Sequence, residues 1–469
     1  MKKKFFFILS LLLVLAAASL ILNSAYVEIE GTFYPRSTSH ITLSGTLRAQ
    51  PEAYARLEHL ESLDLRNCPL SPEEFEAFSA ALPDCRILWS VPFQDKHYSS
   101  DTTELTVSSL SDSDLPVLKY FTHLRTLHAQ GCRDYDQLLA LQSGFPNLKI
   151  RYSVSIGGSE YSPDTTRLTL SDADAGELKE LLPYLPELEY VSLEGVLPEA
   201  SALRSLTEAY PGIQFYWQIE IFGICADVHT TELDLSGIPM DSVSQVEAAV
   251  PYLPALEKVY MMDCGISDEE MGALNRRHNS VLFVWNVNIG PITVRTDITA
   301  FAPVKHGHNL WDRELENLKY CTELVVLDLG HMRLWEIDFL ADLTKLEYLI
   351  IADTHVRDIS PLKNLKNLKF LEMFLLNVTD YTPLLELTAL EDLNICFTAG
   401  DPTVLAQMTW LKRLWCGSYS FTAEQVDQLR TALTDTQVAA PLTGATDQGW
   451  RKGEHYFIMR DLLGMPYLN

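Results

Sequence analysis

The fold is decided by Leu324-Val325-Val326-Leu327-Asp328-Leu329 and by the copies of this hexapeptide that follow it. Apolar residues that recur at a fixed period indicate one structural unit per repeat, and such a unit buries its leucines only against its neighbours. The period is short and regular, because the central leucines of successive units are 22, 22, 22 and 21 residues apart. These central leucines are Leu327, Leu349, Leu371, Leu393 and Leu414.

Short connectors separate these units, as in Asp358-Ile359-Ser360-Pro361-Leu362 and Asp380-Tyr381-Thr382-Pro383-Leu384. The pattern resembles the leucine-rich repeat family, and its Asp-x-Ser/Thr-Pro-Leu connectors look like those of bacterial surface repeats of the internalin type. The resemblance is strong over residues 320–416 and looser over residues 38–297. It implies an α/β leucine-rich repeat solenoid, with a curved parallel sheet and with short helices or loops on the convex side.

A longer period of about 64 residues runs through the region before residue 298. Asp101-Thr102-Thr103-Glu104-Leu105 recurs as Asp164-Thr165-Thr166-Arg167-Leu168 and as His229-Thr230-Thr231-Glu232-Leu233. Each long unit then contains a Leu-x-x-Leu/Val strand and a third strand that alternates with period 2, which indicates one buried face. The aromatics of these third strands are predicted to stack from unit to unit. They are Trp89, Tyr152, Trp217 and Trp285.

Helices are predicted between the strands of the long units. Ser71-x-x-Glu74, Asp174-x-x-Glu177 and Ser267-x-x-Glu270 have the spacing of a capping box, in which a side chain at the helix start accepts a backbone hydrogen bond. The irregular N-terminal repeats therefore differ in length from the 22-residue repeats, but both place short helices or turns between strands.

The N-terminus predicts export. Lys2, Lys3 and Lys4 precede an uncharged apolar run from Phe5 to Leu22. This order matches a signal peptide, and the run is also about long enough, at 1.5 Å per helical residue, to remain as a signal anchor. Both readings stay open, and both place the rest of the chain outside the cytoplasm, either tethered to the membrane by this segment alone or secreted.

Composition excludes other classes of function. The chain has 36 basic and 63 acidic residues and a net charge of −27, whereas a nucleic-acid-binding protein needs a basic face. Eight cysteines in 469 residues are too few for a scaffold held by disulfides. No nucleotide-binding or hydrolase motif is present, so we expect no cofactor and no catalysis.

Three cysteines occupy one slot of the long repeat. Cys68, Cys132 and Cys264 each lie three residues after the last inward residue of a strand, and we interpret them as buried free thiols, with disulfides or metal ligation as the alternative. The most metal-like cluster is His306-Gly307-His308 with Asp312 and His331. Its spacing does not bring three ligands to one face, so it predicts a polar connector.

A partner-binding surface is predicted on the concave face. In a Leu-x-x-Leu-x-Leu strand, the residues between the leucines point to the opposite side of the sheet. Large apolar side chains there would form a contiguous exposed patch of the kind that binds partners, unless the C-terminal tail folds back over them. The candidate residues are Tyr348, Ile350, Phe370, Phe374 and Trp415, with Tyr190 and Tyr260 upstream.

The predicted organisation has five parts. They are a signal peptide or signal anchor (1–25), irregular leucine-rich repeats (26–297), a connector (298–320), regular 22-residue repeats (321–435) and a C-terminal cap (436–469), for which docking of a partner is the alternative role. A repeat solenoid offers a general binding surface. The predicted function is non-catalytic binding of a protein or glycan outside the cytoplasm, and the alternative is a structural spacer or assembly protein of the cell envelope.

Overall fold

The computed structural model describes residues 25–172, 174–417 and 419–468. The chain divides into two compact units, one that ends at Trp217 and one that runs from Gln218 to Asn469. The predicted signal segment lies outside the described residues, apart from Ala25. Within the described ranges, no helix combines the length and the apolar character needed to cross a membrane.

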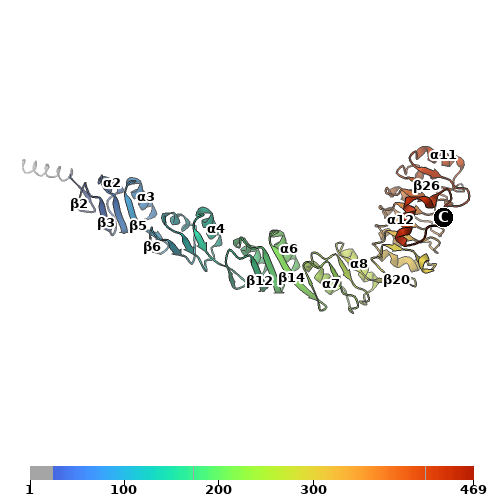
Figure 1. The fold of residues 1–469 in the computed structure, drawn as a ribbon, viewed down its shortest axis with the longest axis horizontal. Coiled ribbons are helices and arrows are strands. Elements are labelled where there is room, and N and C mark those ends of the chain that lie inside the picture. The colour runs from blue at the N-terminus through green and yellow to red at the C-terminus, as the bar shows by residue number, and fades with distance from the viewer. Residues whose placement is uncertain (1–24, 173, 418, 469) are drawn as a thin grey trace, which may run out of the picture. The chain divides into compact units, whose positions relative to one another are not determined.

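The first unit contains three copies of the long repeat, each with three parallel strands (Figure 1). The first copy consists of β3 (His40–Ser44), α2 (Pro51–Tyr54), β4 (Ser62–Asn67), α3 (Pro72–Ala81) and β5 (Arg86–Phe93). The second consists of β7 (Glu104–Thr106), η1 (Leu115–Tyr120), β8 (Thr126–His128), α4 (Tyr135–Gly144) and β9 (Lys149–Arg151). The third consists of β12 (Arg167–Asp172), α5 (Ala175–Leu181), η2 (Leu182–Tyr184), β13 (Tyr190–Val196), α6 (Ala200–Ala209) and β14 (Gln214–Ile221).

Antiparallel hairpins separate these parallel sheets. β1 (Tyr26–Ile29) pairs with β2 (Thr32–Pro35), β5 pairs with β6 (Lys96–Ser99), and β10 (Val154–Ile156) pairs with β11 (Ser159–Tyr161). Gly31 and Gly158 turn two of these hairpins with φ values of 78° and 77°, a conformation that favours glycine. The predicted curved sheet is therefore not continuous in this region, because each long repeat has a parallel sheet of its own.

The second unit begins within β14 and opens with the hairpin of β14 and β15 (Ile224–Asp227). The fourth long repeat follows, with its parallel sheet in the order β16-β17-β18. Its elements are β16 (Glu232–Asp234), α7 (Ser244–Ala249), η3 (Val250–Tyr252), β17 (Lys258–Tyr260), α8 (Asp268–Arg277), β18 (Leu282–Val284) and the hairpin β19 (Asn286–Ile289) and β20 (Ile292–Arg295).

The rest of the second unit is a seven-stranded parallel sheet with one strand per coil. Its strands are β21 (Ala300–Phe301), β22 (Val326–Asp328), β23 (Tyr348–Ile350), β24 (Phe370–Glu372), β25 (Asp392–Asn394), β26 (Arg413–Trp415) and β27 (Gln437–Ala439). Short helices connect them on the other side: η4 (Pro303–His306), α9 (Asp312–Leu315), η5 (Glu316–Tyr320), η6 (Asp338–Asp342), η7 (Ser360–Asn364), η8 (Thr382–Glu386), α10 (Pro402–Leu405) and α11 (Ala423–Ala432). Residues 298–320, predicted as a connector, thus contribute the first strand of this sheet.

The predicted file of leucines is confirmed. Leu327 pairs in register with Leu349, which pairs with Leu371, and the register continues through Leu393 to Leu414. All five side chains are fully buried in one core. At roughly 1.5–3 kcal/mol for each leucine side chain removed from water, this file is a main source of stability for the coils.

Three of the third-strand aromatics contact a tyrosine of the next repeat. The prediction was instead that these aromatics stack on one another. Trp89 meets Tyr120 edge-on, with ring centroids 5.4 Å apart, and Trp285 lies 5.6 Å from Tyr320. The Tyr152 hydroxyl donates a hydrogen bond of 3.0 Å to the carbonyl of Tyr184. These joints therefore use the tyrosine that ends a 3-10 helix of the following repeat.

The predicted helix starts are confirmed. Ser71 accepts a hydrogen bond from the Glu74 amide and completes a capping box, and Ser267 accepts one from the Glu270 amide. Asp174 accepts a hydrogen bond from the Glu177 amide. These caps satisfy backbone donors at helix starts that have no partner within the helix.

Candidate binding surfaces

The concave face of the C-terminal sheet is covered by the chain itself. Residues 440–468, which we call the C-terminal segment, contain η9 (Trp450–Lys452) and α12 (Glu454–Leu463). α12 packs against β21 and β22, so the end of the chain lies beside the first strands of this sheet (Figure 1). The Lys305 ammonium donates a hydrogen bond of 2.6 Å to the Leu463 carbonyl and ties the end of α12 to the first coil.

Trp450 is the centre of this contact. Its side chain is fully buried, and its ring lies 5.1 Å from the Phe370 ring and 5.4 Å from the Trp415 ring. Tyr456, Met459 and Leu463 of the C-terminal segment belong to the same buried cluster. A second apolar core therefore lies on the concave side of the sheet, opposite the leucine file.

Polar side chains of the sheet hold the backbone of the C-terminal segment. Arg413 donates hydrogen bonds of 3.0 and 2.8 Å to the carbonyls of Gly449 and Trp450 and forms an ion pair of 3.0 Å with Asp392. Asn394 donates through Nδ2 to the Ala445 carbonyl at 3.0 Å. Buried polar groups are costly without partners, so these bonds fix one arrangement of the segment on the sheet.

Glu372 is a buried carboxyl at the middle of the contact. It accepts a hydrogen bond of 2.7 Å from Trp450 Nε1. Burial raises the pKa of Glu372 to about 7, the bond from Trp450 opposes this shift, and the nearby carboxylate of Asp328 adds to it. Docking of the C-terminal segment is therefore coupled to protonation of this group.

The prediction of an exposed apolar patch is wrong for the C-terminal sheet. The C-terminal segment covers the predicted patch on this sheet, and each side chain of the patch is at most 8% exposed. Residues predicted to cap the last coil thus cover the concave face, whereas Val426 and Leu429 of α11 and Leu433 after it pack into the leucine core at the end of the array. The covered residues are Tyr348, Ile350, Phe370, Phe374 and Trp415.

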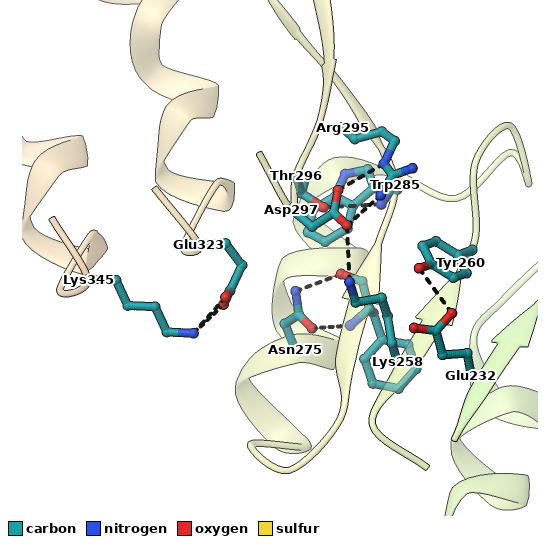
Figure 2. A network of polar contacts seen from close by, with 11 residues as sticks. Glu232, Lys258, Tyr260, Asn275, Trp285, Arg295, Thr296, Asp297, Glu323 and Lys345 are labelled. Carbon is teal, nitrogen blue, oxygen red and sulfur yellow. Dashed lines mark hydrogen bonds and ion pairs between the residues drawn. The ribbon is translucent and has the colours of Figure 1, made fainter. Parts of the chain in front are cut away.

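The outward face of the fourth long repeat carries a polar network of partly or fully exposed side chains (Figure 2). Tyr260 is half-buried, and its hydroxyl lies 3.3 Å from a carboxylate oxygen of Glu232 on the neighbouring strand. The Lys258 ammonium and the Arg295 guanidinium lie over the Tyr260 ring, 5.6 and 5.4 Å from its centroid. The tyrosine is therefore held among charged groups at the surface, where cation–π contacts favour this arrangement.

Asp297 anchors both cations. It accepts hydrogen bonds of 2.8 and 2.5 Å from Arg295 and one of 3.3 Å from Lys258. Burial opposes ionisation of Asp297, but these hydrogen bonds outweigh it and hold its pKa below the ordinary value. Figure 2 also shows the neighbouring ion pair of Glu323 and Lys345, with a shortest distance of 2.6 Å. Sequence reasoning singled out Tyr260 but missed Lys258, Arg295 and Asp297, although Lys258 and Tyr260 are outward positions of one strand.

Tyr190 has a similar environment within the first unit. It is half-buried on β13, and the Arg167 guanidinium of β12 lies 4.1 Å from its ring centroid. Tyr190 belongs to the first unit and Tyr260 to the second.

The cysteine interpretation is confirmed for the three equivalent positions. Cys68, Cys132 and Cys264 are buried free thiols, and burial raises the pKa of each. Across the described residues, no group of three or more His, Cys, Asp or Glu side chains is arranged to hold a metal ion, and this includes the residues around His306 and His308.

No family model and no curated protein matches this chain. Among solved structures it is similar to an internalin C2 of Listeria monocytogenes, with 18% identity over 46% of this chain and 76% of that chain and a TM-score of 0.22. It is also similar to an internalin F of the same organism (15% identity, 88% and 86% coverage, TM-score 0.24) and to a leucine-rich repeat protein of Leptospira interrogans (14% identity, 86% and 90% coverage, TM-score 0.25). The in-register leucine file and the parallel strand in every 22-residue coil show a leucine-rich repeat fold, and the connectors resemble those of the internalin type.

Proposed function

We propose that this leucine-rich repeat protein is exported, tethered to the membrane by its N-terminal segment, and binds a protein or glycan partner without catalysis. The proposal of export and tethering rests on the three lysines followed by the apolar run from Phe5 to Leu22. The proposal of binding rests on the repeats, which hold side chains in fixed rows that a large partner can contact.

One observation carries the choice of surface. The half-exposed Tyr260 lies among Glu232, Lys258 and Arg295 on an open sheet face, whereas the apolar concave face of the following coils is sealed by the C-terminal segment. Tyrosine and arginine are frequent at the energetic centres of interfaces. We therefore propose Tyr260, and by analogy Tyr190, as partner contacts, and we assign Tyr348, Ile350, Phe370, Phe374 and Trp415 to binding only if a partner displaces the segment.

The test is site-specific photocrosslinking of the full chain in its native membrane. A photoreactive residue replaces Tyr260 in one variant and Tyr467 in a control variant, because Tyr467 is a tyrosine that is 51% exposed in the same unit and belongs to the C-terminal segment. We expect a discrete crosslinked product from position 260 that Arg295→Gln weakens. Equal labelling from both positions, or none from position 260, would favour the spacer function.

A further inference from the structure

The lateral side of the C-terminal coils carries an exposed row of aromatic and cationic side chains, which is separate from the concave face. After each of the first strands the chain continues in an extended segment whose residues alternate between exposed and buried. Adjacent segments pair there, since Arg333 N donates to the Leu310 carbonyl at 2.9 Å and His355 N donates to the Leu334 carbonyl at 2.8 Å. The exposed positions form what we call the lateral row: Trp311, Arg333, Trp335, His355 and Arg357.

The rings of the lateral row are stacked across coils. Trp311 and Trp335 are 42% and 43% exposed, and their centroids lie 5.7 Å apart with an interplanar angle of 18°. Trp335 lies 4.4 Å from the His355 ring, and the Arg333 guanidinium lies 4.9 Å from the Trp311 centroid. Two partly exposed tryptophans whose rings are fixed by contacts with neighbouring side chains are more typical of a binding surface than of a structural core.

The arginines of the row lack ionic partners. Neither Arg333 nor Arg357 takes part in an ion pair with any residue that the structure describes. Two carboxylates of the same coils are engaged elsewhere: Asp312 accepts a hydrogen bond from the Trp335 amide, and Asp353 pairs with His331, at 2.8 and 2.7 Å respectively. In a chain of net charge −27, two unpaired guanidinium groups on successive coils mark a local anion-binding surface.

We propose that the lateral row binds an anionic polysaccharide that carries carboxylates. The arginine fork binds a carboxylate through two parallel hydrogen bonds, and an exposed indole offers a flat surface for the apolar face of a sugar ring. Coils about 4.8 Å apart repeat these two contacts along the row, which suits a ligand that is itself a repeating polymer. This site is independent of the concave surface proposed above.

An acidic peptide fits the row less well. A peptide commonly gains affinity by adding a strand to an exposed sheet edge. Here the backbone groups of neighbouring coils already bond to one another, as the bonds of Arg333 and His355 show. A peptide would therefore have only its side chains to use.

The test measures binding of polygalacturonate fragments to the full chain in detergent by titration calorimetry. Dextran serves as the neutral polymer and polyglutamate as the acidic peptide. We expect polygalacturonate to bind, Trp335→Ala to weaken binding about tenfold, and Arg333→Gln to weaken it about fivefold and to reduce its salt dependence, with Arg333→Lys intermediate. Arg276→Gln and Tyr467→Ala are matched controls, because they remove an exposed arginine and an exposed tyrosine elsewhere in the same unit.

Each other outcome overturns the proposal. Absence of polygalacturonate binding, or equal binding by Trp335→Ala and the wild type, would remove the site. Equal binding of polyglutamate would make the ligand an acidic protein, and equal binding of dextran would remove any role for the arginines. Thermal unfolding of each variant verifies that the fold is kept, and the exposure of Trp335 and Arg333 makes this expected.

Discussion

On the fourth long repeat the outward strand positions carry Glu232, Lys258 and Tyr260, whereas on the C-terminal sheet they carry residues such as Tyr348 and Phe370. The first face carries a partly exposed network of hydrogen bonds and ion pairs (Figure 2), and the second is buried beneath the C-terminal segment. The same position in a repeat thus has two structural roles. Its composition decides between them, because a large apolar face in water is costly and the chain contains a segment that can cover it.

Loss of Trp450 should have the largest effect on stability, because this tryptophan lies at the centre of the covered face. Trp450→Ala removes a fully buried ring and leaves the Glu372 carboxyl without its donor. We expect a destabilisation of about 3–5 kcal/mol and release of the C-terminal segment. Urea unfolding gives the free energy, and hydrogen exchange over residues 450–463 reports the release. Trp335→Ala, which removes an exposed tryptophan, serves as the control, and an equal loss in both variants would contradict the role of the segment.

The leucine file on the other side of the sheet should be nearly as sensitive. Leu371→Ala leaves a cavity in the middle of the coil stack and should cost about 2–5 kcal/mol, whereas Leu375→Ala, at a position that is 45% exposed, should have little effect. Denaturant unfolding of the two variants distinguishes them. Comparable stabilities would mean that the coils do not share one core.

The covered and the open faces should respond to pH in opposite directions. The pKa of Glu372 is raised to about 7 in the folded protein. Its contribution to the free energy of unfolding is therefore complete below the ordinary pKa near 4.5 and is lost as the pH rises toward 7. The loss amounts to roughly 3 kcal/mol. Hydrogen exchange over residues 450–463 should therefore accelerate between pH 4.5 and 7 after correction for intrinsic rates. Glu372→Gln should flatten this dependence, and an unchanged profile would argue against the coupling.

The open network should weaken on acidification instead. Hydrogen bonds from Arg295 and Lys258 keep the pKa of Asp297 low against the effect of burial. The stabilisation of the folded state by Asp297 is therefore present above the ordinary aspartate pKa. It is lost as the pH falls through the lowered pKa of Asp297. Arg295→Gln should cost at most about 1 kcal/mol, because Arg295 is largely exposed and solvent screens the pair. Thermal unfolding of the wild type and of Arg295→Gln from pH 3 to 7 isolates this group by difference, because both proteins keep Glu372. A stability advantage of the wild type that grows on acidification would contradict this assignment.

Local pattern was sufficient to predict the repeats. The Leu-x-x-Leu-x-Leu spacing places Leu327, Leu349 and Leu371 in one file, and the capping boxes at Ser71 and Ser267 form as expected. Such features depend on residues a few positions apart. The hairpins that interrupt the long repeats also left a signal, because the alternating third strand continues past the length of its neighbours into a turn with Gly158 or Gly223.

Contacts between distant residues were beyond this reasoning. The bond from Lys305 to Leu463 spans 158 residues, and that from Trp450 to Glu372 spans 78. No local pattern specifies which surface a terminal helix covers, so the tail was predicted to cap the end of the array, and its folding back over the concave face remained only an alternative. The charged network at Asp297 was missed for a related reason, since Lys258 reaches it from 39 residues away.

Hydroxyl-radical footprinting of the full chain tests the central claim most directly, because it reads the solvent exposure of individual aromatic side chains. Tyr348, Phe370 and Trp415 should resist oxidation in the wild type and become reactive in Trp450→Ala, while Tyr260 reacts to the same extent in both proteins. Oxidation of Tyr348, Phe370 and Trp415 in the wild type at the rate of the exposed Tyr419 would contradict the account, since it would mean that the concave face is not sealed.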